Sequence, residues 1–135
     1  MKLICLFGAA ALISGCAATA DSPYAQRRAA AYTVELEKAL AGKVAGKPQS
    51  CIDLRRANGT QQIGDRTILY KVSRKLVYRN DPIGGCAGLG RDRALVTRLY
   101  SSQLCRGDLV TPTDFTTGFS GGACALGDFV PYQSN

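Results

Sequence analysis

The chain has 135 residues, of which 46% are hydrophobic, and its 17 basic and 10 acidic side chains give a formal net charge of +7. This length suits one small domain. Because the chain contains no histidine, it lacks the usual general base near neutral pH and the usual partner of a nucleophilic serine or cysteine, which argues against histidine-dependent catalysis.

The N-terminus has the layout of a secretory signal. Lys2 gives a positive start, and residues 3–13 carry no charge and only small or apolar side chains. This apolar run is too short for a membrane-spanning helix, which needs about 20 apolar residues. We therefore predict a signal peptide over residues 1–15.

The end of the apolar run resembles the lipobox of bacterial lipoproteins. Ile13, Ser14 and Gly15 supply the aliphatic residue, the small residue and the glycine that precede the lipidated cysteine, which here is Cys16. The resemblance implies cleavage before Cys16 and a membrane anchor of lipid on that residue, and several acyl chains together anchor a protein stably.

The residues after Cys16 bear on the destination. They are Ala17 and Ala18 instead of aspartate, and this resembles the sorting pattern of enterobacterial lipoproteins that reach the outer membrane. The prediction is a lipid-anchored envelope protein at the outer membrane, facing the periplasm. The alternative is an ordinary signal cleavage after Ala18 or Ala20.

Residues 16–48 are predicted to form a tether and a helix. Ser22 can cap a helix and Pro23 suits its first turn. Over residues 24–41 the apolar side chains recur at spacings of three and four, and glycines and a proline then end the pattern. The apolar face is narrow, so we expect a spacer that docks only loosely, followed by a flexible joint.

Residues 49–135 are predicted to form a disulfide-linked β-domain. Alternating or β-branched runs separated by turn residues mark six strands, and Asn58-Gly59 is a turn signal. The short connection between the second and third runs predicts a hairpin. The expected fold is mainly β, a small antiparallel meander or open barrel with an N-terminal helix and two disulfides. The six predicted strands are residues 50–54, 66–72, 76–79, 94–100, 104–111 and 123–132.

The cysteines agree with an exported domain. Outside the predicted signal and Cys16, four remain, an even number that predicts two disulfides in an oxidising compartment: Cys51, Cys86, Cys105 and Cys124. No Cys-x-x-Cys pair is present, which argues against a zinc site and against a thioredoxin-like redox site. We expect no metal and no cofactor.

Strand direction predicts how these cysteines pair. If the six strands alternate in direction, Cys51 and Cys105 begin the first and fifth strands at one end of the sheet, while Cys86 and Cys124 lie at the other end. A disulfide needs Cα atoms about 4.4–6.8 Å apart, which favours Cys51–Cys105 and Cys86–Cys124. An extra strand at residues 61–63, or a helix at residues 94–100, would change the count.

Several short motifs of the β-region resemble a family of small proteobacterial envelope proteins of unknown function. No catalytic or binding residues are established for that family, so the resemblance implies one exported domain only. The motifs are Cys51-Ile52, residues 63–70, Tyr78-Arg79-Asn80, residues 86–89, residues 104–108 and residues 124–127.

The basic side chains suggest a binding surface. They are densest on the predicted hairpin, where the candidates for anion binding are Lys71, Arg74, Lys75 and Arg79. A positive surface attracts anions over about 8–10 Å at physiological salt. In an envelope these are lipopolysaccharide and phospholipid head groups and peptidoglycan carboxylates, whereas the compartment argues against nucleic acid. The alternative is a solvated basic surface without a dedicated ligand.

The sequence favours a non-catalytic binding or structural module for an anionic envelope surface or a protein partner. The alternative is a small inhibitor or an enzyme of unrecognised type. Asp108 and Asp128 are a candidate pair of carboxylates for acid and base chemistry, but both stand in sequences typical of turns.

The first prediction concerns the anchor. Cys16→Ala should abolish partition of the protein into membranes and detergent, because no acyl chain can then be attached. Cys5→Ala is the matched control, since Cys5 lies in the segment predicted to be removed. Cell fractionation measures the result, and a Cys16→Ala protein that stays membrane-bound at the wild-type level would contradict lipidation.

Overall fold

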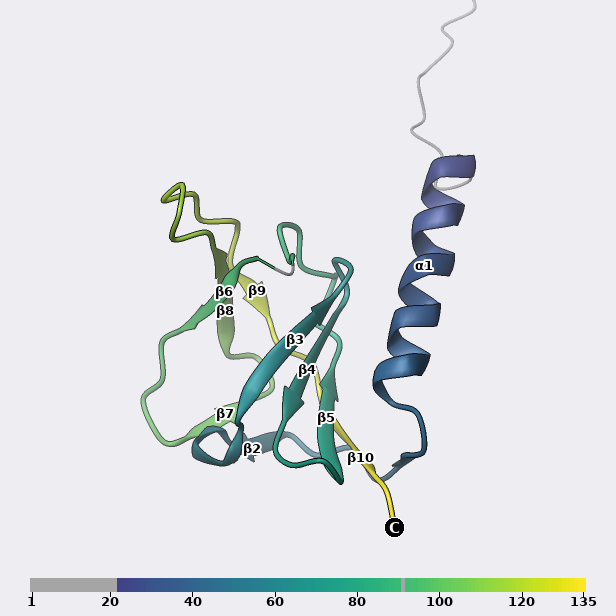
Figure 1. Cartoon of the computed structure of the whole chain (residues 1–135). Coiled ribbons are helices and arrows are strands. Elements are labelled where there is room, and N and C mark those ends of the chain that lie inside the picture. Colours follow the sequence, from purple (N-terminus) through teal and green to yellow (C-terminus); the bar gives the residue numbers. More distant parts are fainter. Residues whose placement is uncertain (1–21, 91) are drawn as a thin grey trace, which may run out of the picture.

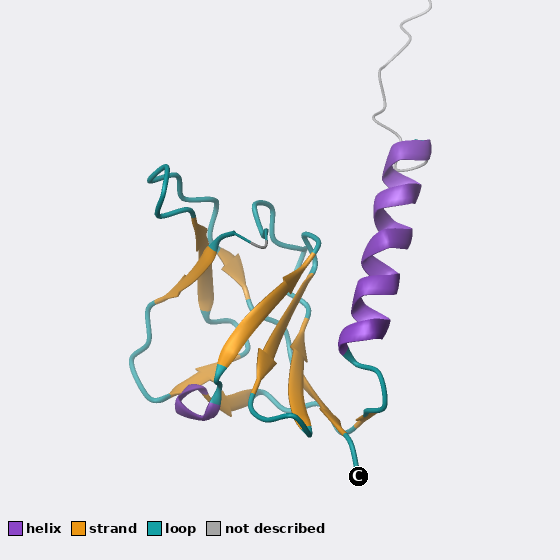
Figure 2. Ribbon diagram, viewed as in Figure 1, coloured by secondary structure: helices purple, strands orange, loops and turns teal. Residues whose placement is uncertain are grey.

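The computed structural model describes residues 22–90 and 92–135. The predicted signal peptide over residues 1–15 and the predicted lipidation site, Cys16, lie outside the described residues. The described chain forms one long helix, a short 3-10 turn and ten strands (Figures 1 and 2). Their bounds are α1 Pro23–Ala39, β1 Val44–Ala45, β2 Cys51–Asp53, η1 Leu54–Arg56, β3 Gly59–Ile63, β4 Thr67–Lys71, β5 Leu76–Asn80, β6 Ala94–Thr97, β7 Gln103–Cys105, β8 Leu109–Thr113, β9 Cys124–Ala125 and β10 Phe129–Gln133.

The strands form three antiparallel sheets. The largest has the order β1-β10-β5-β4-β3, a second pairs β2 with β7, and the third has the order β6-β8-β9. The predicted hairpin is confirmed, because β4 and β5 pair with Lys71 opposite Val77. The protein is thus mainly β and antiparallel with one N-terminal helix and two disulfides, as predicted, and the sheets do not close into a barrel.

Four local predictions are wrong. Residues 123–132 form not one strand but two, β9 and β10, which belong to different sheets. Asn58-Gly59 does not form a turn, because Gly59 begins β3. Asn58 contacts the end of β4: its N–H donates to the carbonyl of Lys71, and its side-chain amide donates to the carbonyl of Val72. Residues 104–111 form two strands separated by a turn in which Gly107 has φ 88°. The expected joint after α1 contains β1, which pairs with β10.

The core lies on both faces of the largest sheet. On one face Ile68 and Tyr70 pack with Phe129 and with apolar side chains of the two smaller sheets. On the other face Leu69 packs with Val77 and with residues of α1. Successive residues of a strand point to opposite faces. Because residues 67–70 of β4 are all buried, this strand is covered on both faces of the sheet.

The helix docks on the sheet through its C-terminal half. Ser22 caps its start by accepting a hydrogen bond from the N–H of Ala25 at 3.2 Å. Leu36 and the Tyr32 ring pack near Ile63, whereas the N-terminal half stays exposed. A Cβ on Gly64 would lie only 2.7 Å from the Tyr32 ring, so the close approach of helix and sheet requires this glycine. The loose docking expected from the sequence describes the N-terminal half only.

Both predicted disulfides, Cys51–Cys105 and Cys86–Cys124, are confirmed. For Cys51–Cys105 the strand count behind the pairing is wrong in two respects that cancel, whereas for Cys86–Cys124 the count does not apply, because β5 and β9 belong to different sheets. The extra strand β3 reverses the direction of the later strands, and the break after Cys105 places this residue at the end of β7 instead of at the start of a strand. Cys51 and Cys105 therefore stand directly opposite each other in the antiparallel pair of β2 and β7.

Helix docking predicts unequal effects of two glycine substitutions. Gly64 and Gly84 have φ 61° and 75°, so alanine at either position should cost about 1–2 kcal/mol from the left-handed backbone. Only Gly64→Ala also displaces the Tyr32 ring, because Gly84 has no atom within 4 Å of its would-be Cβ. Gly64→Ala should therefore lower the free energy of unfolding by about 1 kcal/mol more than Gly84→Ala does, as measured by thermal or urea unfolding. Equal losses would show that the ring does not rest on Gly64.

The core holds one hydroxyl without a partner, which yields a further prediction. Among the described residues the Tyr70 hydroxyl is buried and accepts or donates no hydrogen bond, and burial raises its pKa above the usual value. Tyr70→Phe keeps the edge contact with Phe129 and removes a desolvated polar group. The free energy of unfolding should stay unchanged or rise by about 1 kcal/mol. A clear loss in urea unfolding would reveal a bound partner of the hydroxyl.

Candidate anion-binding surface

The β4–β5 hairpin presents a basic end. Lys71 is the last residue of β4, and Arg74 and Lys75 lie in the turn; all three side chains are exposed. The turn is braced because the Ser73 hydroxyl accepts hydrogen bonds from the N–H groups of Lys75 and Leu76, at 3.2 and 3.1 Å. Arg74 and Lys75 are thus held on a defined turn next to the strand residue Lys71.

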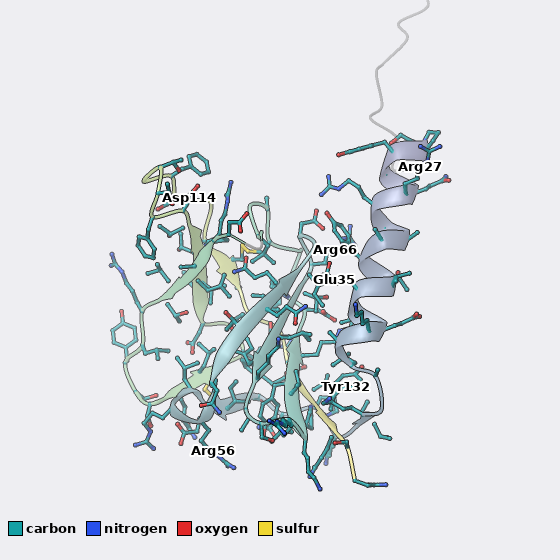
Figure 3. All side chains as sticks on the ribbon, in the orientation of Figure 1. Arg27, Glu35, Arg56, Arg66, Asp114 and Tyr132 are labelled. Atoms are coloured by element: carbon teal, nitrogen blue, oxygen red, sulfur yellow. A yellow bond between two sulfur atoms is a disulfide. The ribbon has the colours of Figure 1, made fainter. Side chains whose placement is uncertain are left out.

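A fourth cation joins them from an adjacent segment. The 3-10 turn η1 ends at Arg56, and Asn58, two residues later, is bonded to the carbonyls of Lys71 and Val72. Arg56 therefore lies at the same end of the molecule as the hairpin, at the bottom of the view in Figure 3. The proximity of Arg56 to the hairpin was not predicted, because Asn58-Gly59 was interpreted as a turn. We call Arg56, Lys71, Arg74 and Lys75 the basic rim.

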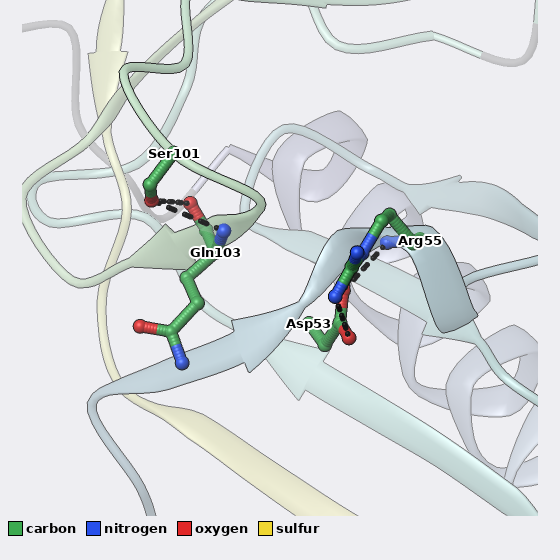
Figure 4. A network of polar contacts seen from close by, with 4 residues as sticks. All are labelled: Asp53, Arg55, Ser101 and Gln103. Carbon is green, nitrogen blue, oxygen red and sulfur yellow. Dashed lines mark hydrogen bonds and ion pairs between the residues drawn. The ribbon is translucent and has the colours of Figure 1, made fainter.

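The neighbouring Arg55 is not part of the rim. Its guanidinium pairs with the Asp53 carboxylate at 3.2 Å, as Figure 4 shows together with the Ser101–Gln103 contacts of the next loop. The hydrogen bond from Arg55 lowers the pKa of Asp53. Because the two charges compensate each other, this pair adds little to the field around the rim.

Arg79, the fourth residue predicted from the sequence, lies elsewhere. It stands near the far end of β5, where it pairs with Asp81 at 2.8 Å, and Asp81 also accepts a hydrogen bond from Thr67. Burial acts to lower the pKa of Arg79, but the hydrogen bond and the charge of Asp81 raise it above its usual value. The structure brings Lys71, Arg74 and Lys75 together and leaves Arg79 with its own counter-ion.

The rim cations have no directly bonded counter-ion among the described residues. In residues 22–90 and 92–135 none of the four side chains has an ion-pair or hydrogen-bond partner. Side chains of one sign without internal partners create a potential that attracts the opposite charge. The rim can therefore bind carboxylates or phosphates, and salt should weaken that binding.

The carboxylates considered for catalysis have structural contacts. Asp108 accepts a hydrogen bond from the N–H of Cys105 at 2.7 Å, and Asp128 pairs with Arg106 at 2.9 Å. Each stabilises a chain reversal near β7 or β10. In the described part of the chain no three metal-ligating side chains gather into a potential metal site.

A groove of about 920 Å³ lies between α1 and the sheet. It is lined by cations and anions together, among them Arg28, Arg66, Asp65 and Asp81, so it has no dominant charge. Arg28 donates hydrogen bonds to the Tyr32 hydroxyl at 3.0 and 2.6 Å. The rim is therefore the stronger candidate for binding anions.

Comparisons extend the description no further. Over the described residues, no helix is long and apolar enough to cross a membrane. The resemblance to small envelope proteins stays a prediction. Searches against protein-family models, curated proteins and solved structures give no match.

Proposed function

We propose that the protein is a lipid-anchored module of the cell envelope, without catalytic activity of its own, that binds an anionic envelope component through the basic rim. The observation that carries the proposal is the presence, at one end of the molecule, of four cations that form no ion pair among the described residues. The lipobox-like sequence before Cys16 supports the anchor and the compartment.

The position of the rim favours one class of anion. The N-terminus of α1, from which the chain leads back to Cys16, lies at the top of the view in Figure 1, whereas the β4–β5 turn lies at the bottom. The 17 residues of α1 alone span about 25 Å. A rim at the far end faces away from the anchoring membrane, so peptidoglycan carboxylates are better placed to meet it than the head groups of that membrane.

The proposal predicts a selective loss of binding to peptidoglycan. Lys71→Gln/Arg74→Gln/Lys75→Gln removes three rim cations, and Arg27→Gln/Arg66→Gln/Arg98→Gln removes three exposed cations from other surfaces. At about 0.5 kcal/mol per exposed cation, the rim variant should bind isolated sacculi about tenfold more weakly, with a flatter salt dependence. The matched variant should bind like the wild type.

Co-sedimentation with sacculi over a range of salt concentrations measures both variants. Equal loss in the two would show that net charge acts without a site, and salt-independent binding would contradict the electrostatic account. Binding of the wild type to anionic phospholipid vesicles, but not to sacculi, would contradict the choice of peptidoglycan.

A further inference from the structure

The loop between β8 and β9, residues 114–123, presents two phenylalanines to solvent. Phe115 is 74% exposed and Phe119 is 58% exposed. A phenylalanine side chain gains about 1.5–3 kcal/mol when it is moved from water into an apolar environment. Two of them on one short loop therefore form a surface that favours an apolar partner.

The loop geometry holds these rings outward. The Asp114 carboxylate accepts hydrogen bonds from the N–H groups of Thr116 and Thr117, and the Asp114 N–H donates to the carbonyl of Phe119 at 2.8 Å. The hydrogen bond from Thr117 lowers the pKa of Asp114, so the brace stays ionised at neutral pH. Gly118, with φ 72°, closes the turn. Exposure of the rings is thus built into the loop.

A cation stands at the base of the loop. The Arg93 guanidinium lies 5.3 Å from the centre of the Phe119 ring. Aromatic rings together with basic side chains are typical of surfaces that enter the interfacial layer of a membrane, where the ring meets acyl chains and the cation meets phosphate.

The loop lies at the end of the molecule that leads to the predicted anchor. In Figure 1 the tip of the loop, yellow-green at the upper left, and the N-terminus of α1 both lie at the top, opposite the basic rim. Cys16 precedes Ser22 by six residues, which can span at most about 20 Å. A lipid on Cys16 therefore places the membrane within reach of Phe115 and Phe119.

We propose that loop 114–123 is a second membrane contact, in which Phe115 and Phe119 insert into the interfacial layer of the bilayer that holds the lipid on Cys16. This inference rests on the proposed lipid anchor and goes beyond it. The lipid gives attachment, whereas the loop gives orientation, because two separate contacts fix the molecule with its basic rim pointing away from the membrane.

The test uses tryptophan as a reporter, since the chain contains none. Phe115→Trp is made in the full-length lipidated protein, and Tyr100→Trp is the matched control. Tyr100 is fully exposed and belongs to the β6–β7 loop, which lies lower in the view of Figure 1. Both proteins are reconstituted into vesicles of phosphatidylcholine and phosphatidylglycerol, with or without bromine near the glycerol end of the acyl chains.

We expect brominated lipid to quench most of the Phe115→Trp emission and to leave the Tyr100→Trp emission unchanged. If the protein floats with the vesicles but bromine affects neither reporter, the loop contact is wrong while the anchor stands. If the wild type does not float with vesicles, the anchor fails and the loop contact falls with it. A Phe115→Trp emission that is blue-shifted without lipid, in a protein that runs as a dimer, would assign the loop to a second copy instead.

Discussion

The buried disulfide between Cys86 and Cys124 ties the largest sheet to the three-stranded sheet. It joins the connection after β5 in the largest sheet to β9 in the three-stranded sheet, and both cysteines belong to the main hydrophobic cluster. The second disulfide links the two strands of the small sheet formed by β2 and β7. For loops of 38 and 54 residues, chain entropy gives about 4 kcal/mol each, a large share of the stability of a small domain.

The docked helix turns this cross-linked unit into a molecule with two different ends. Tyr32 against Gly64, followed by Leu36, holds the C-terminal half of α1 on the sheet face opposite the main cluster. The N-terminus of α1 then lies at the same end as the phenylalanine loop, and the basic rim lies at the other end (Figure 1). A loosely attached helix would remove this polarity, because the rim could then face the membrane as readily as it faces away. The proposals on anchor, rim and loop therefore share one geometric condition.

The local signals in the sequence predicted much of the fold. The Ser22 cap and the hairpin were correct, because capping and alternation act over short range, and the even number of cysteines correctly predicted two disulfides. Their pairing was also correct, although the strand count behind it was wrong. Strand β3 was only an alternative and not one of the six predicted strands, since its polar residues depend on distant partners: the buried Gln62 side chain accepts a hydrogen bond from the N–H of Gly90 and donates one to the carbonyl of Arg93. Such a contact, across about 30 residues of chain, leaves no pattern in the strand itself.

The candidate site was predicted only in part, because some of its residues are brought together by contacts that are distant in the sequence. Charge density along the hairpin indicated Lys71, Arg74 and Lys75, which the structure keeps exposed and close in the chain. Arg79 was grouped with them although an aspartate follows two residues later, and that spacing on an extended strand places both side chains on one face, where they pair. Arg56 could not be predicted, because its place beside the hairpin follows from the unexpected contact of Asn58 with β4.

The most direct test of the account is the contact between helix and sheet in solution. Nuclear Overhauser effects between the Tyr32 ring protons and the α-protons of Gly64, measured on the full-length lipidated protein in micelles, report it without any substitution. The account predicts strong cross-peaks and Gly64 α-protons shifted upfield by the ring. Absent cross-peaks, with random-coil shifts for Gly64, would show that the helix is a free spacer and that the two ends have no fixed orientation.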